Sequence, residues 1–380
     1  MKKIYLGLAA VALTVVLAGC GMQNANQQTS SQQNGNEPIK IGFLGPLTGD
    51  VATVGQNNKA ATELAVDAIN NSGGINGRQI QMIWEDGKCD GQEAANAASK
   101  LVNIDKVTAI IGGGCSAETL AAAPIAEQGK VIMFSPLSSN PSITAAGDYI
   151  FRDYPSDSYQ GAKAAEFAMN ELQGKNIAVL SCMSDWCTGV AKVFKDKVNS
   201  SGGKIIDSET FTDNQANDLR TQLTKIKNAK ADVIYFLAYS DATINGLKQI
   251  KQLGIKAKLL GGDSWDDPKI AKGAGTAAEG TIYFKPSAKM TDAFKAAMAA
   301  KTGNNEVDTG SPQAYDAVNI LAGIMKNVGT DTAKIKDALY QVKDYNGVSG
   351  VITLDSNGDL ATANYDINMI KDGKAVPFVK

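Results

Sequence analysis

The sequence predicts an α/β protein with two doubly wound lobes, each built on a parallel sheet, joined by a hinge of several strands. Apolar runs of strand length alternate with segments of helical periodicity through most of the chain. This alternation is typical of parallel βαβ units that are covered on both faces. The chain has 380 residues, which is long enough for two domains.

Two pairs of similar segments indicate that the α/β unit is repeated. The helix-to-strand passage 69-INNSGGINGRQI-80 is similar to 198-VNSSGGKII-206. The strand-to-helix passage 109-AIIGGGCSAET-119 is similar to 234-IYFLAYSDAT-243. Because both pairs keep the same order along the chain, each half is expected to form one lobe.

The expected elements follow in order. The first strand is the apolar run 39-IKIGFLGP-46, and a helix over 55–71 follows until Gly73-Gly74 ends it. The first half continues with strand 79–86, helix 91–103, strand 107–112, helix 117–128 and strand 131–136. The second half is expected to contain helix 158–172, strand 176–181, helix 188–200, strand 204–209, helix 216–229, strand 232–238, helix 241–253 and strand 258–262.

The C-terminal remainder is too short for a third domain, so it is expected to return to the two lobes. Its pattern predicts helices 289–302, 311–328 and 332–341 and strands 348–354 and 365–371. The expected first lobe is 39–153 with about 285–346, and the second is 154–284 with about 347–380. This division makes the chain cross between the lobes repeatedly.

The N-terminus is expected to be a lipoprotein signal peptide, residues 1–19. Lys2 and Lys3 precede an apolar run of 15 residues, 4–18, which is short for a membrane span of about 20. The run ends in 17-LAGC-20, which resembles the bacterial lipobox and implies cleavage before Cys20 and lipid on that cysteine. The alternative is an uncleaved anchor helix. Residues 20–38 are mostly Gln, Asn, Ser and Gly, so we expect a flexible tether that holds the folded part at a membrane, outside the cytoplasm.

The composition excludes several classes of function. The chain has no histidine, which removes the commonest general base and the commonest metal ligand. Its net charge is −2 without long blocks of one sign, which argues against nucleic acid as a partner. Asp86, Asp90 and Glu118 lie near strand ends, but nothing pairs them as acid and base. We therefore expect no enzymatic activity, no cofactor and no metal.

Four cysteines remain if Cys20 carries lipid: Cys89, Cys115, Cys182 and Cys187. An even number outside the cytoplasm suggests disulfides, for which three pairings are possible. A zinc site is the alternative. The spacing of Cys182 and Cys187 is not the C-x-x-C of a redox enzyme.

The stretch 112-GGGCSAET-119 joins a predicted strand to a predicted helix. It is not a phosphate loop, because no Gly-Lys-Ser/Thr follows. It is not expected to hold a nucleophile either, because the chain lacks a histidine to activate one. Helix N-termini attract anions, so a milder anion site at Ser116 is the remaining functional hypothesis.

Six segments occur in an order that resembles a known family. They are the lipobox, IKIGFLGPLTGDVATVGQ, NSGGINGRQI, WEDGKCD, IIGGGCSAET and MFSPLSSNPSIT. This pattern is similar to that of the type I periplasmic binding proteins, and within them to the leucine/isoleucine/valine-binding branch of ABC-importer substrate-binding lipoproteins. The resemblance covers residues 39–380 and implies a ligand cleft between the two lobes, beyond the carboxyl ends of the strands. It also implies a disulfide between Cys89 and Cys115, which leaves Cys182 to pair with Cys187.

The resemblance implies where the main-chain groups of an amino acid would bind. The carboxylate is expected at Ser116 and Ser139 and at main-chain groups of the turn residues Leu137 and Ser138, and the ammonium is expected at Asp263 and Ser139. The structural alternative for Ser116 is a simple helix cap. For Asp263 it is a turn residue, although Asp267-Pro268 already fits the start of a helix.

The ligand side chain is expected to contact five further residues: Tyr239, Trp186, Val54, Trp265 and Gly310. Trp186 stands where relatives often carry Tyr, and its alternative role is that of a core aromatic. Val54 and Gly310 depart from the family, which has aromatic residues there, and Trp265 is expected to fill part of that space. The apolar wall is therefore built differently from that of the branch.

The resemblance implies a monomeric, membrane-anchored, extracytoplasmic protein that captures an amino acid, aliphatic or branched-chain, and delivers it to ABC permease subunits. Closure of the lobes would exclude water around the bound ligand. The alternative is a ligand-sensing receptor component for amino acids or amides.

Overall fold

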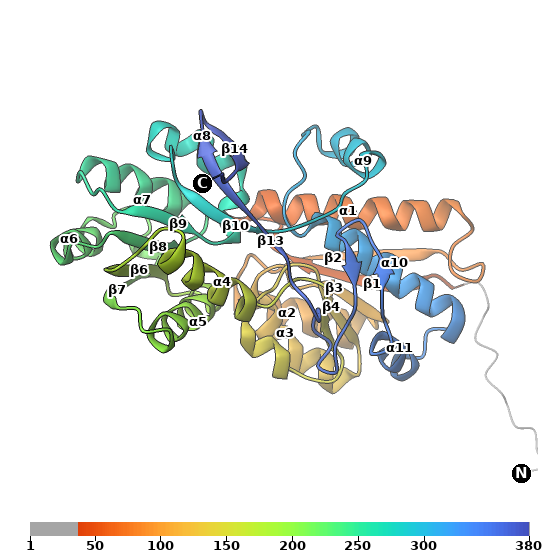
Figure 1. Ribbon diagram of the computed structural model, residues 1–380. Helices are drawn as coiled ribbons and strands as arrows, with labels where there is room; N and C mark the ends of the chain where they lie inside the picture. The colour runs from red at the N-terminus through yellow and green to blue at the C-terminus, as the bar shows by residue number, and fades with distance from the viewer. Residues whose placement is uncertain (1–36, 380) are drawn as a thin grey trace, which may run out of the picture. The chain divides into compact units, whose positions relative to one another are not determined.

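The computed structural model describes residues 37–379 (Figure 1). The expected signal peptide, the lipidation site Cys20 and nearly all of the expected tether lie outside the described residues. Within residues 37–379, no helix is long and apolar enough to cross a membrane.

The first lobe is built on a five-stranded parallel sheet with the order β2-β1-β3-β4-β5. The strands are β1 Ile39–Gly45, β2 Ile80–Asp86, β3 Ala109–Gly112, β4 Ile132–Ser135 and β5 Ile150–Arg152. Ile41 of β1 is level with Met82 of β2 and Ala109 of β3. Because both faces of β1 are covered, its sequence is a nearly continuous apolar run rather than an alternating one.

Alternate side chains along each strand point to opposite faces of the sheet, and each face packs against its own hydrophobic core. Ile41 and Phe43 of β1 pack with helices α1 (Ala52–Asn71), α10 (Ser311–Val328) and α11 (Thr332–Leu339). Leu44 and Ile110 pack instead with helices α2 (Gly91–Ser99) and α3 (Ser116–Gly129). Figure 1 shows the two groups of helices on opposite sides of the sheet. The predicted doubly wound lobe is thereby confirmed.

The second lobe is built on a seven-stranded sheet with the order β14-β13-β10-β9-β8-β6-β7. Its strands are β6 Ile177–Cys182, β7 Ile205–Phe211, β8 Val233–Leu237, β9 Lys258–Gly261, β10 Ile282–Pro286, β13 Tyr365–Lys371 and β14 Lys374–Pro377. The strands β6 to β10 are parallel, whereas β13 and β14 join the edge in antiparallel fashion. The flanking helices are α4 Asp157–Asn170, α5 Asp185–Ser200, α6 Arg220–Ala229, α7 Ser240–Gln252 and α8 Pro268–Ala274.

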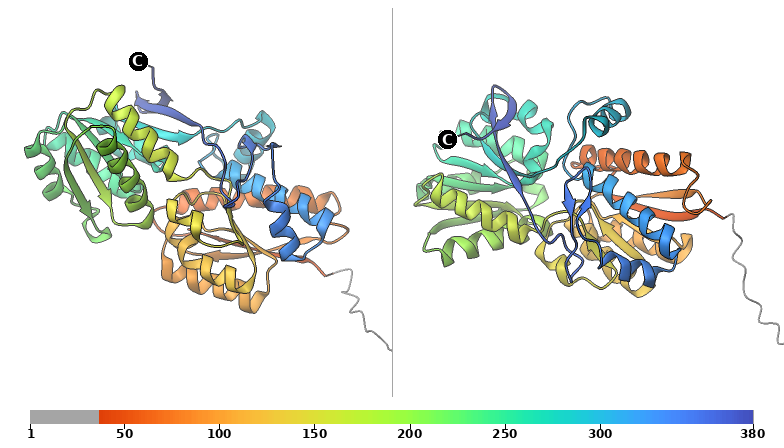
Figure 2. Two further views of the ribbon diagram at one scale, coloured as in Figure 1. Left: turned by 60° about the horizontal axis from the view of Figure 1, so that its bottom comes forward. Right: turned by 45° about the vertical axis from the view of Figure 1, so that its right-hand side comes forward.

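The chain passes between the lobes three times. The passages lie between β5 and α4, between β10 and α9 (Asp292–Thr302), and between Leu360 and β13, as Figure 2 shows from two sides. Residues 345–354 stay with the first lobe, because Ile352 and Leu354 are buried in its core. The lobe boundary expected near residue 347 therefore lies later in the chain, between Leu360 and Tyr365.

Several elements differ from the expected ones. The expected strand 348–354 is only the short strand β12 Val351–Ile352, which pairs with β11 Tyr345–Asn346. The strands β5, β10 and β14 were not among the expected elements; they have 3, 5 and 4 residues. Such short strands carry too few residues for a periodic signal, and β10 and β14 also contain Lys and Pro.

A buried ion pair fixes the first passage against the third. Arg152, at the end of β5, is fully buried and its guanidinium binds Asp359 through two hydrogen bonds, Nε to Oδ1 at 2.7 Å and Nη2 to Oδ2 at 2.8 Å. Its remaining Nη1 donates to the carbonyl oxygen of Asn140 at 2.9 Å. One side chain thus joins the hinge to the turn that follows β4.

Candidate ligand-binding site

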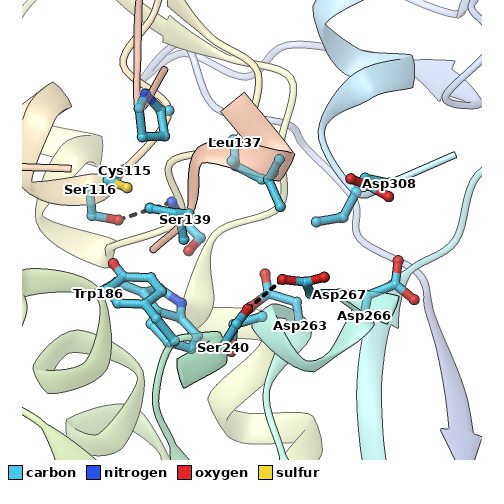
Figure 3. A pocket seen from close by; sticks show the side chains of 17 residues that line it. Cys115, Ser116, Leu137, Ser139, Trp186, Ser240, Asp263, Asp266, Asp267 and Asp308 are labelled. Atoms are coloured by element: carbon cyan, nitrogen blue, oxygen red, sulfur yellow. Dashed lines mark hydrogen bonds between the residues drawn. The ribbon is translucent and has the colours of Figure 1, made fainter. Parts of the chain in front are cut away.

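A cavity lies where the carboxyl ends of strands from both lobes meet (Figure 3). This is the position at which open parallel sheets bind ligands. Of the expected site residues, Ser116, Ser139, Leu137, Asp263, Tyr239, Trp186 and Val54 line the cavity. The other lining residues are Pro46, Val51, Gly114, Cys115, Ser240, Ser264, Asp266, Asp267, Asp308 and Thr309.

Ser116 is the first residue of helix α3 and is almost fully buried. Its Oγ accepts hydrogen bonds from the backbone N–H of Ser139 at 3.3 Å and of Asn140 at 3.1 Å. The loop before it is held by Glu118, whose carboxylate accepts from the N–H groups of Gly114 and Cys115. Two of the loop N–H groups are therefore already satisfied within the protein, and the hydroxyl of Ser116, which lines the cavity, is one of the donors left for a ligand.

The disulfides pair as the family resemblance implied. Cys89 is bonded to Cys115, which ties the loop before α3 to the chain after β2. Cys182 is bonded to Cys187 and closes a short loop at the start of α5 that contains Trp186. Burial raises the pKa of Glu118, which lies beside the first disulfide, to about 7.

The turn after β4 presents some of its residues to the cavity and anchors others. Ser139 and Leu137 line the cavity. Ser138 does not, because its Oγ donates to the carbonyl oxygen of Gly113 at 2.9 Å and lies 2.6 Å from the hydroxyl of Thr119. The side chain of Ser138 therefore fastens the turn to the loop before α3, and the main-chain contact expected from this residue stays a prediction.

A buried chain of hydrogen bonds connects Ser139 of the first lobe to Asp263 of the second. The Oγ of Ser139 donates to Oδ2 of Asp157 at 2.9 Å, and Nε2 of Gln160 donates to Oδ1 of the same carboxylate at 2.9 Å. The backbone N–H of Asp263 donates to Oε1 of Gln160 at 2.9 Å. Tyr154 completes the chain, since its hydroxyl donates to Oδ2 of Asp263 at 2.7 Å.

This chain places two carboxylates in one buried network. Burial raises the pKa of the Asp157 and Asp263 carboxyls above their ordinary values, and the charge of Asp263 raises that of Asp157 further. Asp157 is the first residue of α4, and the helix N-terminus favours its negative form. A positive ligand group beside Asp263 would favour the ionised forms of both.

Two aromatic rings form one wall of the cavity. The rings of Trp186 and Tyr239 lie 5.3 Å apart at an angle of 30°. Tyr239 precedes α7, and Trp186 is held by the loop that the second disulfide closes. This wall offers a flat apolar surface to a ligand.

Two of the expected pocket residues do not line the cavity. Trp265 is buried in the core of the second lobe, where its ring meets Phe236 at 90° with centroids 5.8 Å apart. Asp263–Asp266 form a turn of 3₁₀ helix, so Asp263 and Asp266 lie on one side and Trp265 points to another. Gly310 adopts φ +82° before α10, next to Leu137, and adds no side chain to the cavity.

The cavity is also lined by three carboxylates that were not expected in the site, although Asp267 was expected to cap a helix. Asp266 and Asp267 come from the turn after Asp263, and Asp308 comes from the segment before α10. Burial raises the pKa of Asp308 to about 6. Residue 308 lies between elements, so no periodicity or helix-start signal could have placed it in the site.

The two lobes also touch at the edge of the cavity. Asp50, in the loop between β1 and α1, accepts from the N–H of Asp241 at 3.2 Å and lies 3.3 Å from Nζ of Lys269. On the other side, Nδ2 of Asn140 donates to the carbonyl oxygen of Asp185 at 2.5 Å. These contacts hold the walls together around the cavity.

A family model described as periplasmic binding protein matches residues 38–375. The chain belongs to the periplasmic binding protein family. This membership confirms the resemblance seen in the sequence, and with it the type I fold with two lobes. The family comprises extracytoplasmic substrate-binding proteins rather than enzymes.

Three relatives show how far the similarity reaches. The leucine-, isoleucine-, valine-, threonine-, and alanine-binding protein of Pseudomonas aeruginosa is 32% identical, over 87% of this chain and 89% of its own. The leucine-binding protein LivK of Thermotoga maritima superposes with a TM-score of 0.82 at 28% identity, covering 90% of this chain and 98% of its own. LivJ of Streptococcus pneumoniae, solved with isoleucine, superposes with a TM-score of 0.81 at 29% identity, covering 89% and 97%.

Proposed function

We propose that this protein is a lipid-anchored, extracytoplasmic substrate-binding protein of an ABC importer. Acting as a monomer, it would capture an α-amino acid, aliphatic and branched-chain ones among them, and deliver it to the permease. The observation that carries this proposal is the polarity of the cavity, which has a hydroxyl donor at one point and carboxylate acceptors opposite it. That arrangement is complementary to a zwitterion.

The carboxylate is assigned to the Ser116 side of the cavity. The Oγ of Ser116 already accepts two backbone hydrogen bonds, so the hydrogen of its hydroxyl is free to be donated to a ligand. The first turn of α3 adds N–H groups without intrahelical acceptors and a partial positive charge. An uncharged site of this kind binds a carboxylate well once water is excluded.

The ammonium is assigned to Asp263 and Ser139. The hydroxyl hydrogen of Ser139 is engaged by Asp157, so its oxygen faces the ligand as an acceptor. Ser139 was expected to serve both ends of the ligand, and this direction of donation favours the ammonium end. Asp157 and Gln160 would act as positioning residues, because they orient Ser139 and Asp263 without touching the ligand themselves.

The side chain of the ligand is assigned to the apolar surfaces of the cavity. Trp186 and Tyr239 supply one surface, and Val54, Val51 and Leu137 supply the other. The relatives named for leucine, isoleucine and valine support an aliphatic ligand. Calorimetric titration with the proteinogenic amino acids tests the proposal, and failure of every one of them to bind would contradict it.

Removing the hydroxyl of Ser116 tests the carboxylate assignment. We expect Ser116→Ala to weaken binding of the best amino acid by about 10- to 100-fold, because a hydrogen bond to a charged group contributes about 1.5–3 kcal/mol. The matched control is Ser208→Ala, an exposed serine of β7, which should leave the affinity unchanged. An unchanged dissociation constant in Ser116→Ala would refute the assignment.

The lipid anchor is tested by changing Cys20. We expect the full-length protein to partition with the membrane fraction and Cys20→Ala to move into the soluble fraction, because the thiol that carries the lipid is gone. Immunoblots of fractionated cells, with a Cys20→Ser variant beside Cys20→Ala, measure this. Membrane retention of both variants would favour the uncleaved anchor helix instead.

A further inference from the structure

The cleft carries more negative charge than a neutral amino acid needs. Four of its lining residues are aspartates, and none of the residues that line it is Lys or Arg. Asp263 is sufficient for one ammonium, which leaves Asp266, Asp267 and Asp308 beyond it. Figure 3 shows Asp308 and Asp266 on the opposite side of the cleft from Ser116.

These three carboxylates differ in what already binds them. Asp266 pairs with Nζ of Lys285 at 2.7 Å. Asp267 begins α8, where its Oδ1 accepts from the N–H of Lys269, and its Oδ2 accepts from the hydroxyl of Ser240 at 2.5 Å. Asp266 is therefore neutralised by a lysine, and both oxygens of Asp267 already accept hydrogen bonds.

Asp308 is different, because one of its oxygens is open. Its Oδ2 accepts from Nδ2 of Asn57, whereas Oδ1 has no hydrogen-bond partner within residues 37–379. The residue is only 4% exposed, yet it lines the cleft. Its Oδ1 is not one of the side-chain atoms that are both buried and unpartnered, so it is accessible from the cleft, where a donor or cation of a ligand can reach it.

The shape of the cleft leaves room for a longer side chain. Val51, Val54 and Leu137 give the cleft an apolar lining. A second cavity adjoins the first and shares Asp308, Asp266 and Asp267 with it. This second cavity is also lined by Lys285, Lys295 and Lys374, so the space that suits a positively charged side-chain end is the part beside Asp308.

We propose that the cleft also takes α-amino acids whose side chain is an aliphatic stem with a positively charged end, with that charge bound at Oδ1 of Asp308. The inference rests on the proposed function, since the amino acid must first be held at Ser116 and Asp263. Within residues 37–379 no three His, Cys, Asp or Glu side chains are placed to hold a metal ion, so an organic cation is the better match.

The test compares two ligands that differ only in the charged end. Lysine and norleucine share their backbone groups and stem, but norleucine ends in a methyl group where lysine has an aminomethyl group. Calorimetry at pH 7.5 on the full chain should show lysine bound at least as tightly as norleucine. In Asp308→Asn, lysine should lose about tenfold or more in affinity while norleucine changes by less than about threefold, because only lysine has a charge to pair.

The control variant is Asp337→Asn, an exposed aspartate of α11 that lines neither cavity, and it should leave both affinities unchanged. Should Asp308→Asn bind neither ligand, a second pair, ornithine and norvaline, decides on the unmodified protein. The inference is overturned if the unmodified protein binds lysine more weakly than norleucine and ornithine more weakly than norvaline. It is also overturned if Asp308→Asn lowers the affinities for lysine and norleucine equally.

Failure of the proposed function gives a different result. If leucine, norleucine and lysine all fail to bind, the site is not an amino-acid site and the extension falls with it. If leucine and norleucine bind while lysine does not, the proposed function stands and the role of Asp308 is refuted.

Discussion

Replacing Asp263 by asparagine is expected to weaken amino-acid binding more than any other single change in the cleft. The asparagine can still accept the 2.7 Å hydrogen bond from Tyr154, so the local structure is retained and only the negative charge is lost. Truncating one side of a buried charge pair costs about 2–5 kcal/mol. We therefore expect the dissociation constant for leucine to rise by roughly 30-fold to several thousand-fold in calorimetric titrations.

A ligand without an ammonium separates the lost charge from general damage. The hydroxy acid 2-hydroxy-4-methylpentanoate has the carboxylate and side chain of leucine, so Asp263→Asn should affect it far less. Asp196→Asn, an exposed change on α5, serves as the protein control. Equal losses for leucine and the hydroxy acid would mean that Asp263 supports the cleft instead of binding the ammonium.

Replacing Arg152 by methionine is expected to destabilise the whole protein. The change leaves Asp359 buried beside a neutral side chain and removes a donor from the carbonyl oxygen of Asn140. Breaking a buried ion pair from one side costs about 3–5 kcal/mol. Urea unfolding should show a loss of this size in the free energy of unfolding, with a lower midpoint.

The double variant Arg152→Met with Asp359→Leu shows whether the uncompensated charge causes the loss. It should recover part of the stability, because no buried charge then remains unpaired. Arg220→Met provides the control, since Arg220 pairs with Asp218 on an exposed surface and its replacement should change stability little. A loss below about 1 kcal/mol in Arg152→Met would show that the hinge does not depend on this pair.

The sequence was informative where local chemistry determines structure. Buried strands such as Ile39–Gly45 could be predicted because a strand covered on both faces is one apolar run. The start of α8 could be predicted because Asp267 caps it and Pro268 is its first residue, whereas the cap of α3 is Cys115 and Ser116 is the first residue of that helix. The residues Ser116, Ser139 and Asp263 came from motif order, and all three line one cavity.

The parts of the site that could not be predicted depend on contacts between segments that are distant in the sequence. Asp157 and Gln160 matter because they meet Ser139 and Asp263 in space, and no local pattern reveals this. Trp265 was misplaced because the 3₁₀ turn that rotates it into the core cannot be distinguished from a loop in the sequence. Asp308 likewise has no signal of its own in the chain.

The three passages between the lobes have a consequence for the order of folding. Helices α10 and α11, from the last quarter of the chain, supply much of the core that covers one face of the first sheet. The N-terminal lobe therefore cannot complete its core until the strands of the other lobe have already emerged. Multidomain chains usually fold from the N-terminus onward, one domain after another. Here the second lobe, whose strands β6 to β10 are continuous in sequence, lacks only its edge strands β13 and β14 at that point. A chain that ends after β10 would leave α1 as the only one of the three helices on that face of the first sheet.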